Sequence, residues 1–526
     1  MQKEIDTKSC SNEKIAKNTL MLYFRMFFVM AVSLYTVRII LSILGETDYG
    51  IYNVVGGIIV MLSFFNRTLA SAAQRFFSYE LGKKDYSKLN RTFCVLLLLF
   101  IIMSVIVILI SETIGLWFLN NKMTIPEDRI IIARWIFQFS IASFVITLMA
   151  TPYQALIISH EDMKIYAFMG IVESILLLIS TYILYITKEY IDSLLLYGLL
   201  TFFSVLVTRS CYYFYSRRHY AETNFLFCKD MVIFRQLFSY CSWTIFGTTS
   251  GIVRSHGINL LINTFFSPAI NAARGIAYQV NNAINHFASN FHTAVKPQIT
   301  KLYAQNELDS AFSLVNKSSK LSFFLLLFLA TPISVFAEQI LNIWLVKVPD
   351  YTILFLRLVI IVALIDSLSN SLMTLAQATG NIALYQFVVG MTLIMNLPLS
   401  WLFLFWGYPP QYTLYVAITM SFVALQGRLY ILKKIVKFPI YNFYISVLFR
   451  VLLVSLISLA CNISVFIYIY SLHPSFFLFL LSFTLCIVLS LLIIWVFGLD
   501  KSEKKYICRI VEEKILKRRS SSETHI

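Results

Sequence analysis

The sequence predicts an all-α polytopic membrane protein. Its 526 residues are 58% hydrophobic and only 13% charged, whereas a soluble domain is about 45–50% apolar and about 25% charged. The mean hydropathy is +0.74 over the whole chain, and the formal net charge is +16. This composition excludes a soluble enzyme, a nucleic-acid-binding protein and a disordered chain.

Fourteen stretches are long enough to cross a bilayer, which takes about 20 mostly apolar residues. Most of them are continuous runs of Leu, Ile, Val and Phe, but the second, seventh and eighth contain many polar residues for helices that face lipid. The predicted spans are 19–44, 50–78, 92–119, 130–157, 163–186, 191–215, 237–265, 269–296, 320–345, 351–377, 382–406, 412–433, 441–470 and 475–498.

The distribution of Lys and Arg predicts the orientation, because these residues collect in cytoplasmic loops. With the N-terminus placed inside, twenty-nine of them fall in inside segments. Only four fall outside: Lys122, Arg129, Lys188 and Lys347. We therefore expect a multi-pass protein with both termini in the cytoplasm and only short outside loops.

A weak internal repeat divides the chain. Residues 50–82, two polar helices and a basic turn, are echoed about 220 residues later by 271–296 and the charged turn that follows. Parallel repeats related by an axis along the membrane normal are a transporter architecture, with the substrate path between the halves. We expect an N-terminal lobe with a cytoplasmic linker (1–236), a second six-helix lobe (237–437), and two further helices with a basic tail (438–526).

Ten arginines fall inside predicted spans. Arg75, Arg209 and Arg450 lie near cytoplasmic ends, where an arginine can extend its charge to the headgroups. Five others lie in the first helix pair of each half, and an arginine at mid-membrane costs about 2.5–3.5 kcal/mol unless it faces protein or a water-filled cavity. The sequence therefore predicts a cationic cavity between the halves, or alternatively a buried polar network joining two helices; the five are Arg25, Arg38, Arg67, Arg254 and Arg274.

Polar residues accompany these arginines in the seventh and eighth spans. On the eighth, several recur every three or four residues together with Arg274, so they share one helical face. The predicted polar lining is His256, Asn259, Tyr278, Asn281, Asn285, Ser289 and His292.

An arginine fork binds phosphate in a bidentate manner, and amide and hydroxyl groups suit sugars. The expected ligand is therefore an anionic headgroup on a lipid tail. Two intramembrane acids, Glu173 and Asp366, are candidates for ion coupling or for pairing with a cavity arginine. No catalytic residue, metal site or cofactor is expected.

Three features resemble the Wzx-type polysaccharide (O-antigen) flippases of the multidrug/oligosaccharidyl-lipid/polysaccharide (MOP) exporter superfamily. They are the run Gly45-Glu46-Thr47-Asp48-Tyr49-Gly50-Ile51-Tyr52, the polar helix ending Ala72-Ala73-Gln74-Arg75-Phe76, and Gly82 before the basic turn. The resemblance implies two lobes in a V, a cationic lumen lined by the first two helices of each lobe, and alternating access. It further implies translocation of undecaprenyl-diphosphate-linked oligosaccharide across the bacterial inner membrane, for surface polysaccharide and lipopolysaccharide biosynthesis.

Two other functions stay open at this point. One is a drug or metabolite antiporter of the same superfamily; the other is a membrane-embedded glycan polymerase or ligase, against which the short outside loops weigh. Expected partners are a lipid-linked anionic oligosaccharide, membrane lipid, and polysaccharide polymerase and chain-length proteins, but no nucleic acid.

Overall fold

The computed structural model describes residues 2–121, 126–224, 230–266, 268–345, 348–470, 475–501 and 503–504. These residues are almost entirely helical and include no strand. A helix satisfies its backbone hydrogen bonds within one segment, as the interior of a bilayer requires. The all-α prediction is therefore confirmed.

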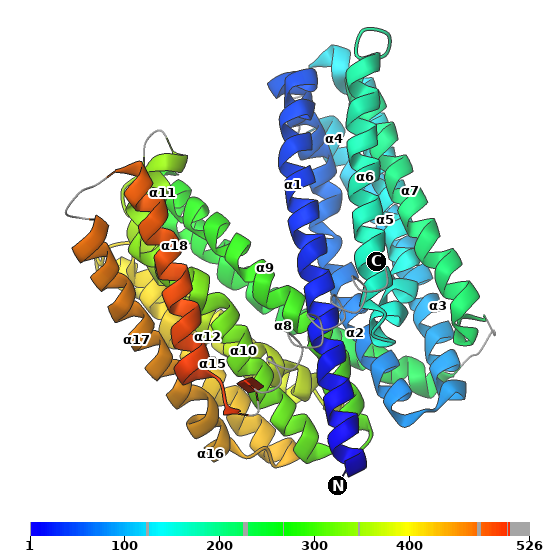
Figure 1. The fold of residues 1–526 in the computed structure, drawn as a ribbon. Coiled ribbons are helices and arrows are strands. Elements are labelled where there is room, and N and C mark those ends of the chain that lie inside the picture. The colour runs from blue at the N-terminus through cyan, green and yellow to red at the C-terminus, as the bar shows by residue number, and fades with distance from the viewer. Residues whose placement is uncertain are drawn as a thin grey trace, which may run out of the picture.

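The helices form two arms that diverge from a common end, so that the molecule has the shape of a V (Figure 1). The first arm contains α1 (Gln2–Met61), α2 (Ser63–Lys83), α3 (Tyr86–Ile110), α4 (Leu116–Asn121), α5 (Ile130–Ser159), α6 (Met163–Thr187) and α7 (Ser193–His219). The second contains α8 (Met231–Phe265), α9 (Pro268–Ala304), α10 (Leu308–Val335), α11 (Ala337–Trp344), α12 (Thr352–Thr379), α13 (Ala383–Ile394), α14 (Asn396–Phe405) and α15 (Tyr412–Val436).

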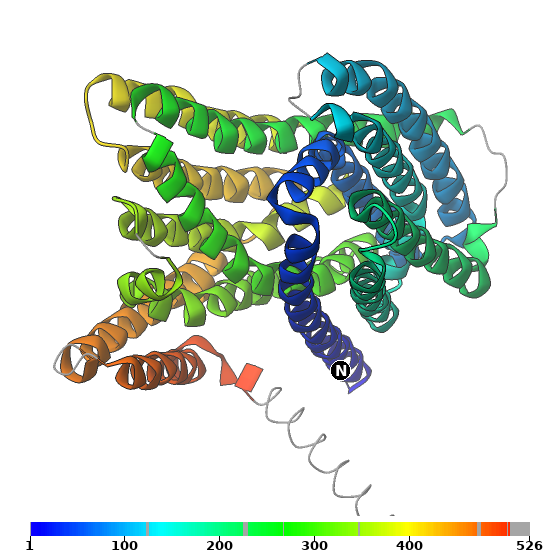
Figure 2. The same ribbon diagram turned by 90° about the horizontal axis from the view of Figure 1, so that it is seen from above.

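Three further helices complete the second arm: α16 (Ile440–Phe443), α17 (Arg450–Val465) and α18 (Phe476–Ile493). Each arm has a buried core, and buried clusters also join the arms, since Leu237 and Tyr240 of α8 pack with Phe76 of α2. Phe77, Phe93 and Phe100 are fully buried in the first arm, and Phe355 and Phe443 in the second. Seen from above, α1 and α9 lie where the two arms approach each other (Figure 2).

Eleven described helical segments are long and apolar enough to span a membrane. Residues 46–83, 231–265 and 268–304 are not among these eleven, and they contain the second, seventh and eighth predicted spans, the three with many polar residues. The predicted count of fourteen spans stays a prediction.

Two boundaries differ from the predicted ones. The first span and much of the second belong to one helix, α1, bent sharply at Gly45. Its φ of 72° is a conformation that favours glycine. The proposed lobe boundary at residue 236 falls inside α8, because the Asp230 side chain caps this helix and starts it at Met231. The predicted basic tail lies almost wholly outside the described residues.

The turns rich in Lys and Arg lie at the end of the molecule where the arms meet and the chain starts (Figure 1). We call this end the basic face; it carries Lys83, Arg218, Lys301 and Lys434. The opposite face carries the turn between α6 and α7 and the turn between α14 and α15.

Candidate functional site between the two arms

Arg75 of α2 joins the arms at the basic face. It donates from Nε to the Gln377 carbonyl oxygen at 3.0 Å and from Nη2 to the Ala378 carbonyl oxygen at 2.8 Å. These carbonyls end α12, where a cation interacts favourably with the helix dipole. Arg75 is 6% exposed, so the expectation that it reaches the headgroups is wrong: the second arm supplies its partners.

Glu161, in the turn between α5 and α6, is the second link between the arms. Its carboxylate accepts from Lys301 Nζ at 2.7 Å and Gln298 Nε2 at 3.2 Å, both on α9, and pairs with Lys14 of α1 at 3.3 Å. Burial by itself raises the pKa of Glu161. The two lysines and the amide outweigh burial and hold this pKa below its ordinary value.

Two further hydrogen bonds complete the closure. Lys296 on α9 donates to the Ser71 hydroxyl at 2.8 Å, and the Tyr23 hydroxyl on α1 donates to the Phe287 carbonyl at 3.1 Å. The arms are thus closed at the basic face and apart at the opposite face (Figure 1). The helices that meet between them are α1, α2, α8 and α9, the four that carry the five predicted arginines.

Arg25 lies inside the first arm. Its guanidinium stacks over the Tyr166 ring, 4.4 Å from the centroid, and a Cβ added at Gly170 would clash with its Nε. Gly170 therefore makes the space for this side chain. Nearby, Arg209 pairs with Glu173 at 3.2 Å, so its charge is neutralised within the arm.

The second arm has a similar pair. Arg254 lies 3.7 Å from Asp366; the Arg254 side chain is 16% exposed and the Asp366 side chain 43% exposed. Asp366 thus pairs with one of the predicted cavity arginines, which was one of the two interpretations that the sequence left open, whereas Glu173 pairs with Arg209, which is outside that set. Their role in ion coupling stays a prediction.

Arg274 joins α8 to α9. It is buried, and it donates to the Asn259 side-chain oxygen, to the Ser255 carbonyl at 3.3 Å and to the Tyr278 hydroxyl at 3.3 Å. Of the two interpretations that the sequence offered, Arg274 therefore fits the second, a buried polar network that joins two helices. Its role in binding a substrate stays a prediction.

Arg38 on α1 and Arg67 on α2 are exposed. Within the described part of the chain, neither has a hydrogen-bond or ion-pair partner. Together with Arg25, Arg254 and Arg274 they make up the five predicted arginines, of which only Arg254 pairs with a carboxylate among the described residues. The four helices that meet between the arms therefore carry a positive surplus.

The predicted polar face of α9 turns mostly into the second arm. Asn281 is buried, Asn285 donates to the Asn281 carbonyl at 3.0 Å, and His292 is within 3.1 Å of the Thr374 hydroxyl on α12. Ser289 on α9 and His256 on α8 are exposed.

A different ridge of α9 is solvent-accessible. It consists of Gln279, Asn282, His286 and Ser289. Helical periodicity groups residues into faces, but it does not indicate which face packs on α12. The small residues Ala273, Ala277 and Ala288 decide this, because they let the neighbouring helices approach the other side of α9.

The first arm contains a cavity of about 480 Å³ that the sequence did not predict. Hydroxyl-bearing side chains from four helices, α1, α2, α5 and α7, meet there, and Gly56 and Gly57 also line it. Its polar lining is Tyr52, Ser63, Ser140, Ser143, Thr147 and Thr201. Serine and threonine are common in membrane helices, so no sequence signal marks this convergence.

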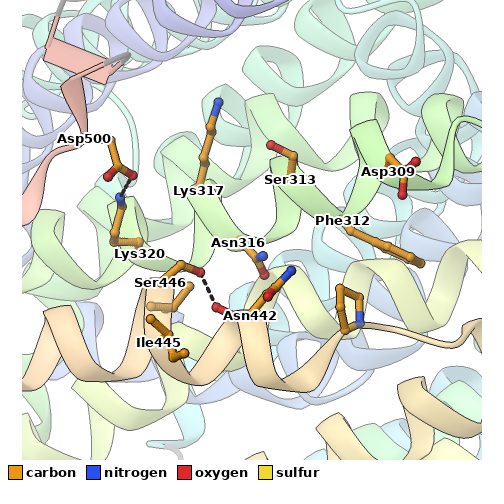
Figure 3. Close-up of a pocket in the computed structure, with 12 residues that line it drawn as sticks. Asp309, Phe312, Ser313, Asn316, Lys317, Lys320, Asn442, Ile445, Ser446 and Asp500 are labelled. Carbon is orange, nitrogen blue, oxygen red and sulfur yellow. Dashed lines mark hydrogen bonds and ion pairs between the residues drawn. The ribbon is translucent and has the colours of Figure 1, made fainter.

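A second cavity, of about 420 Å³, lies at the basic face between α10 and α16 (Figure 3). Lys320 at its edge is almost fully buried and pairs with Asp500 at 3.0 Å and Glu503 at 2.9 Å. Arg450 also pairs with Asp500, so this predicted headgroup arginine anchors the chain after α18. Burial raises the pKa of Asp500, but the two cations hold it below its ordinary value.

Solved structures with this fold are membrane transporters. A MATE structure in complex with MaD3S matches with a TM-score of 0.69 at 13% identity, over 80% of this chain and 97% of that one. An outward-facing multidrug resistance MATE family transporter of the MOP superfamily matches with 0.69 at 15% identity, over 81% and 97%. A MOP superfamily transporter from Pyrococcus furiosus, with a binding pocket of reversed polarity, matches with 0.65 at 14% identity, over 79% and 94%.

No protein-family model matches the chain, and no curated protein matches it at a significant level. The similarity to solved structures shows that the chain has the fold of MATE transporters of the MOP superfamily. Its many long, apolar helices indicate a multi-pass membrane protein. About a fifth of the chain is not covered by these matches.

Proposed function

We propose that the chain is a flippase that moves a lipid-linked anionic oligosaccharide across the bacterial inner membrane by alternating access. The observation that carries this proposal is the surplus of arginine on the helices that meet between the arms, where only Arg254 of the five predicted arginines pairs with a carboxylate among the described residues. A cation at this depth is costly unless it serves a polar pathway. An undecaprenyl diphosphate headgroup supplies the missing negative charge.

Arg38 and Arg67 are the residues we assign to the diphosphate, because they are exposed and have no partner among the described residues. Arginine offers five donors in a planar fork that matches phosphate oxygens. Arg25, Arg254 and Arg274 already have partners and would maintain the positive field around the headgroup. The exposed ridge of α9 and the hydroxyl-lined cavity of the first arm suit the sugars.

The positive-inside rule places the basic face in the cytoplasm. Under that orientation both termini are cytoplasmic, and the closure by Arg75 and Glu161 corresponds to the state open to the periplasm. We propose surface polysaccharide biosynthesis as the setting, with polysaccharide polymerase and chain-length proteins as partners. No catalytic step is assigned to the chain.

A drug or metabolite antiporter is the second candidate. One structural neighbour is a multidrug resistance transporter, and the half-exposed Asp366 offers a carboxylate for ion coupling. Another neighbour has a binding pocket of reversed polarity, so pocket charge differs within the superfamily. The positive surplus disfavours cationic drugs here and favours the flippase.

The test is complementation of a bacterial strain that lacks its own O-antigen flippase. The double variant Arg38→Ala/Arg67→Ala should lose surface polysaccharide while the protein still inserts. Arg134→Ala is the matched control, because Arg134 is an exposed arginine that bonds Asn120 at 3.0 Å near the opposite face. Full polysaccharide export by the double variant would refute the proposal, and efflux of a cationic dye by wild-type protein would favour the antiporter.

A further inference from the structure

A cavity of about 890 Å³ lies at the basic face in the seam between the two arms. Its walls come from α2 and the start of α3 in the first arm, and from α8 and the turn between α12 and α13 in the second. It lies at the basic-face end of α2, beyond Arg67, and is separate from the arginines assigned to transport. A ligand here would touch both arms at once.

The cavity is cationic. Arg75, Lys83, Lys88 and Arg235 line it, and the acid among its walls, Glu80, already pairs with Lys88 at 3.0 Å. Lys83 and Arg235 are exposed and come from opposite arms. Two cations on facing walls attract an anion, and without one they repel each other.

One hydroxyl of the wall has no hydrogen-bond partner among the described residues. The Tyr240 hydroxyl is buried and, within the described ranges, makes no hydrogen bond. A buried unpaired hydroxyl is costly, and most such groups have a partner. Tyr240 can donate to an acceptor oxygen that enters the cavity, and the Arg75 guanidinium lies 5.7 Å from its ring.

The same cavity has an apolar border. Met231 and Val232, in the first turn of α8, line it and are 73% and 68% exposed. A soluble anion would leave these side chains in water, whereas the tail of an amphipathic ligand would cover them. A basic pocket between helices at a membrane surface is a typical site for an anionic lipid headgroup.

We propose that this cavity binds the phosphate headgroup of an anionic lipid. Lys83 and Arg235 hold the phosphate oxygens from the two arms, Tyr240 donates a hydrogen bond, and the lipid tail lies over Met231 and Val232. The bound lipid braces the arms in the state closed at the basic face. The site does not depend on what the chain transports.

The experiment measures binding of three probes to the full-length protein purified in detergent. The probes are dioctanoyl phosphatidic acid, dioctanoyl phosphatidylcholine and inorganic pyrophosphate. We expect saturable binding of the phosphatidic acid and none of the phosphatidylcholine. In Lys83→Ala/Arg235→Ala the dissociation constant should rise about tenfold, because two charge-assisted contacts are lost.

Arg218→Ala is the control, since Arg218 is an exposed arginine of the basic face outside the cavity. It should bind as wild type does, and an unchanged melting temperature shows that each variant is folded. Equal binding of phosphatidylcholine, or an unchanged dissociation constant in the double variant, would overturn the proposal. So would pyrophosphate binding as tightly as the lipid, because the site would then serve a soluble anion.

Discussion

Replacing Glu161 by glutamine should weaken the closure of the arms at the basic face. Glu161 is 6% exposed and accepts from Lys301 at 2.7 Å, with Gln298 and Lys14 as further partners. The glutamine side chain keeps the size of the original but removes the charge, and the Lys301 ammonium loses its counter-ion. The state in which the arms separate at this face frees Lys301 to reach water.

The magnitude follows from the burial of the partners. Removing one partner of a fully buried ion pair costs about 3–5 kcal/mol. Lys301 is 22% exposed and Lys14 49% exposed, so water screens part of the interaction. We expect roughly 1–3 kcal/mol, which corresponds to about a 5–150-fold change in the ratio of the two states.

Double electron–electron resonance measures this ratio. Spin labels at Lys188→Cys, beside the turn between α6 and α7, and Trp406→Cys, beside the turn between α14 and α15, report the separation of the arms at the opposite face. Both positions are exposed, and the other cysteines are removed. The variant should add a population at shorter distance, because opening at the basic face brings the opposite ends together.

The control is Glu307→Gln, another carboxylate of the basic face, which has no ion-pair partner within the described residues. It should leave the distances unchanged. Identical distributions in wild type and Glu161→Gln would refute the reasoning that this ion pair closes the arms.

Three other predictions concern single contacts. Gly170→Ala places a Cβ closer than 3.0 Å to the Arg25 side chain, so it should displace Arg25 and destabilise the fold by about 1–3 kcal/mol, seen as a lower melting temperature; an unchanged temperature would contradict this geometry. Lys320→Met should destabilise by roughly 2–4 kcal/mol and expose the segment near Asp500 to protease, since it leaves the buried Glu503 carboxylate without its cation. The lowered pKa of Glu161 keeps its ion pairs intact above the ordinary value of 4.5, with loss only as pH falls through the folded-state pKa. Arm distances should therefore be equal at about pH 6.5 and about pH 5.5, and a change between these values would contradict the assignment.

Parts of the site could be predicted from the sequence. Arginine in an apolar helix needs a partner or a polar space whatever the fold is, so Arg25, Arg254 and Arg274 stood out from their surroundings. The same reasoning identified Glu173 and Asp366, both of which pair with arginines. The partners themselves lie on other helices and have no local signal.

Arg75 shows where sequence reasoning ends. Its position near a helix end suggested contact with headgroups, but its partners are carbonyls about 300 residues away on α12. Gly380 makes this approach possible, since it has a φ of 77° and a Cβ there would stand 2.6 Å from Arg75 Nη2. The sequence around Arg75 gives no sign of Gly380, and the sequence around Gly380 gives no sign of Arg75.

The sequence by itself determined that this is an all-helical membrane protein, that its basic loops share one face, and that arginine gathers in the first helix pair of each half. These properties follow from composition and from the length of apolar runs, because the bilayer acts on each segment separately. Only the tertiary structure decided which face of α9 is buried, which acid pairs with which arginine, and at which end the arms close. Those outcomes depend on contacts between segments far apart in the chain. For α9, which has polar residues on more than one face, the packing of small side chains against a neighbouring helix determines which face is buried.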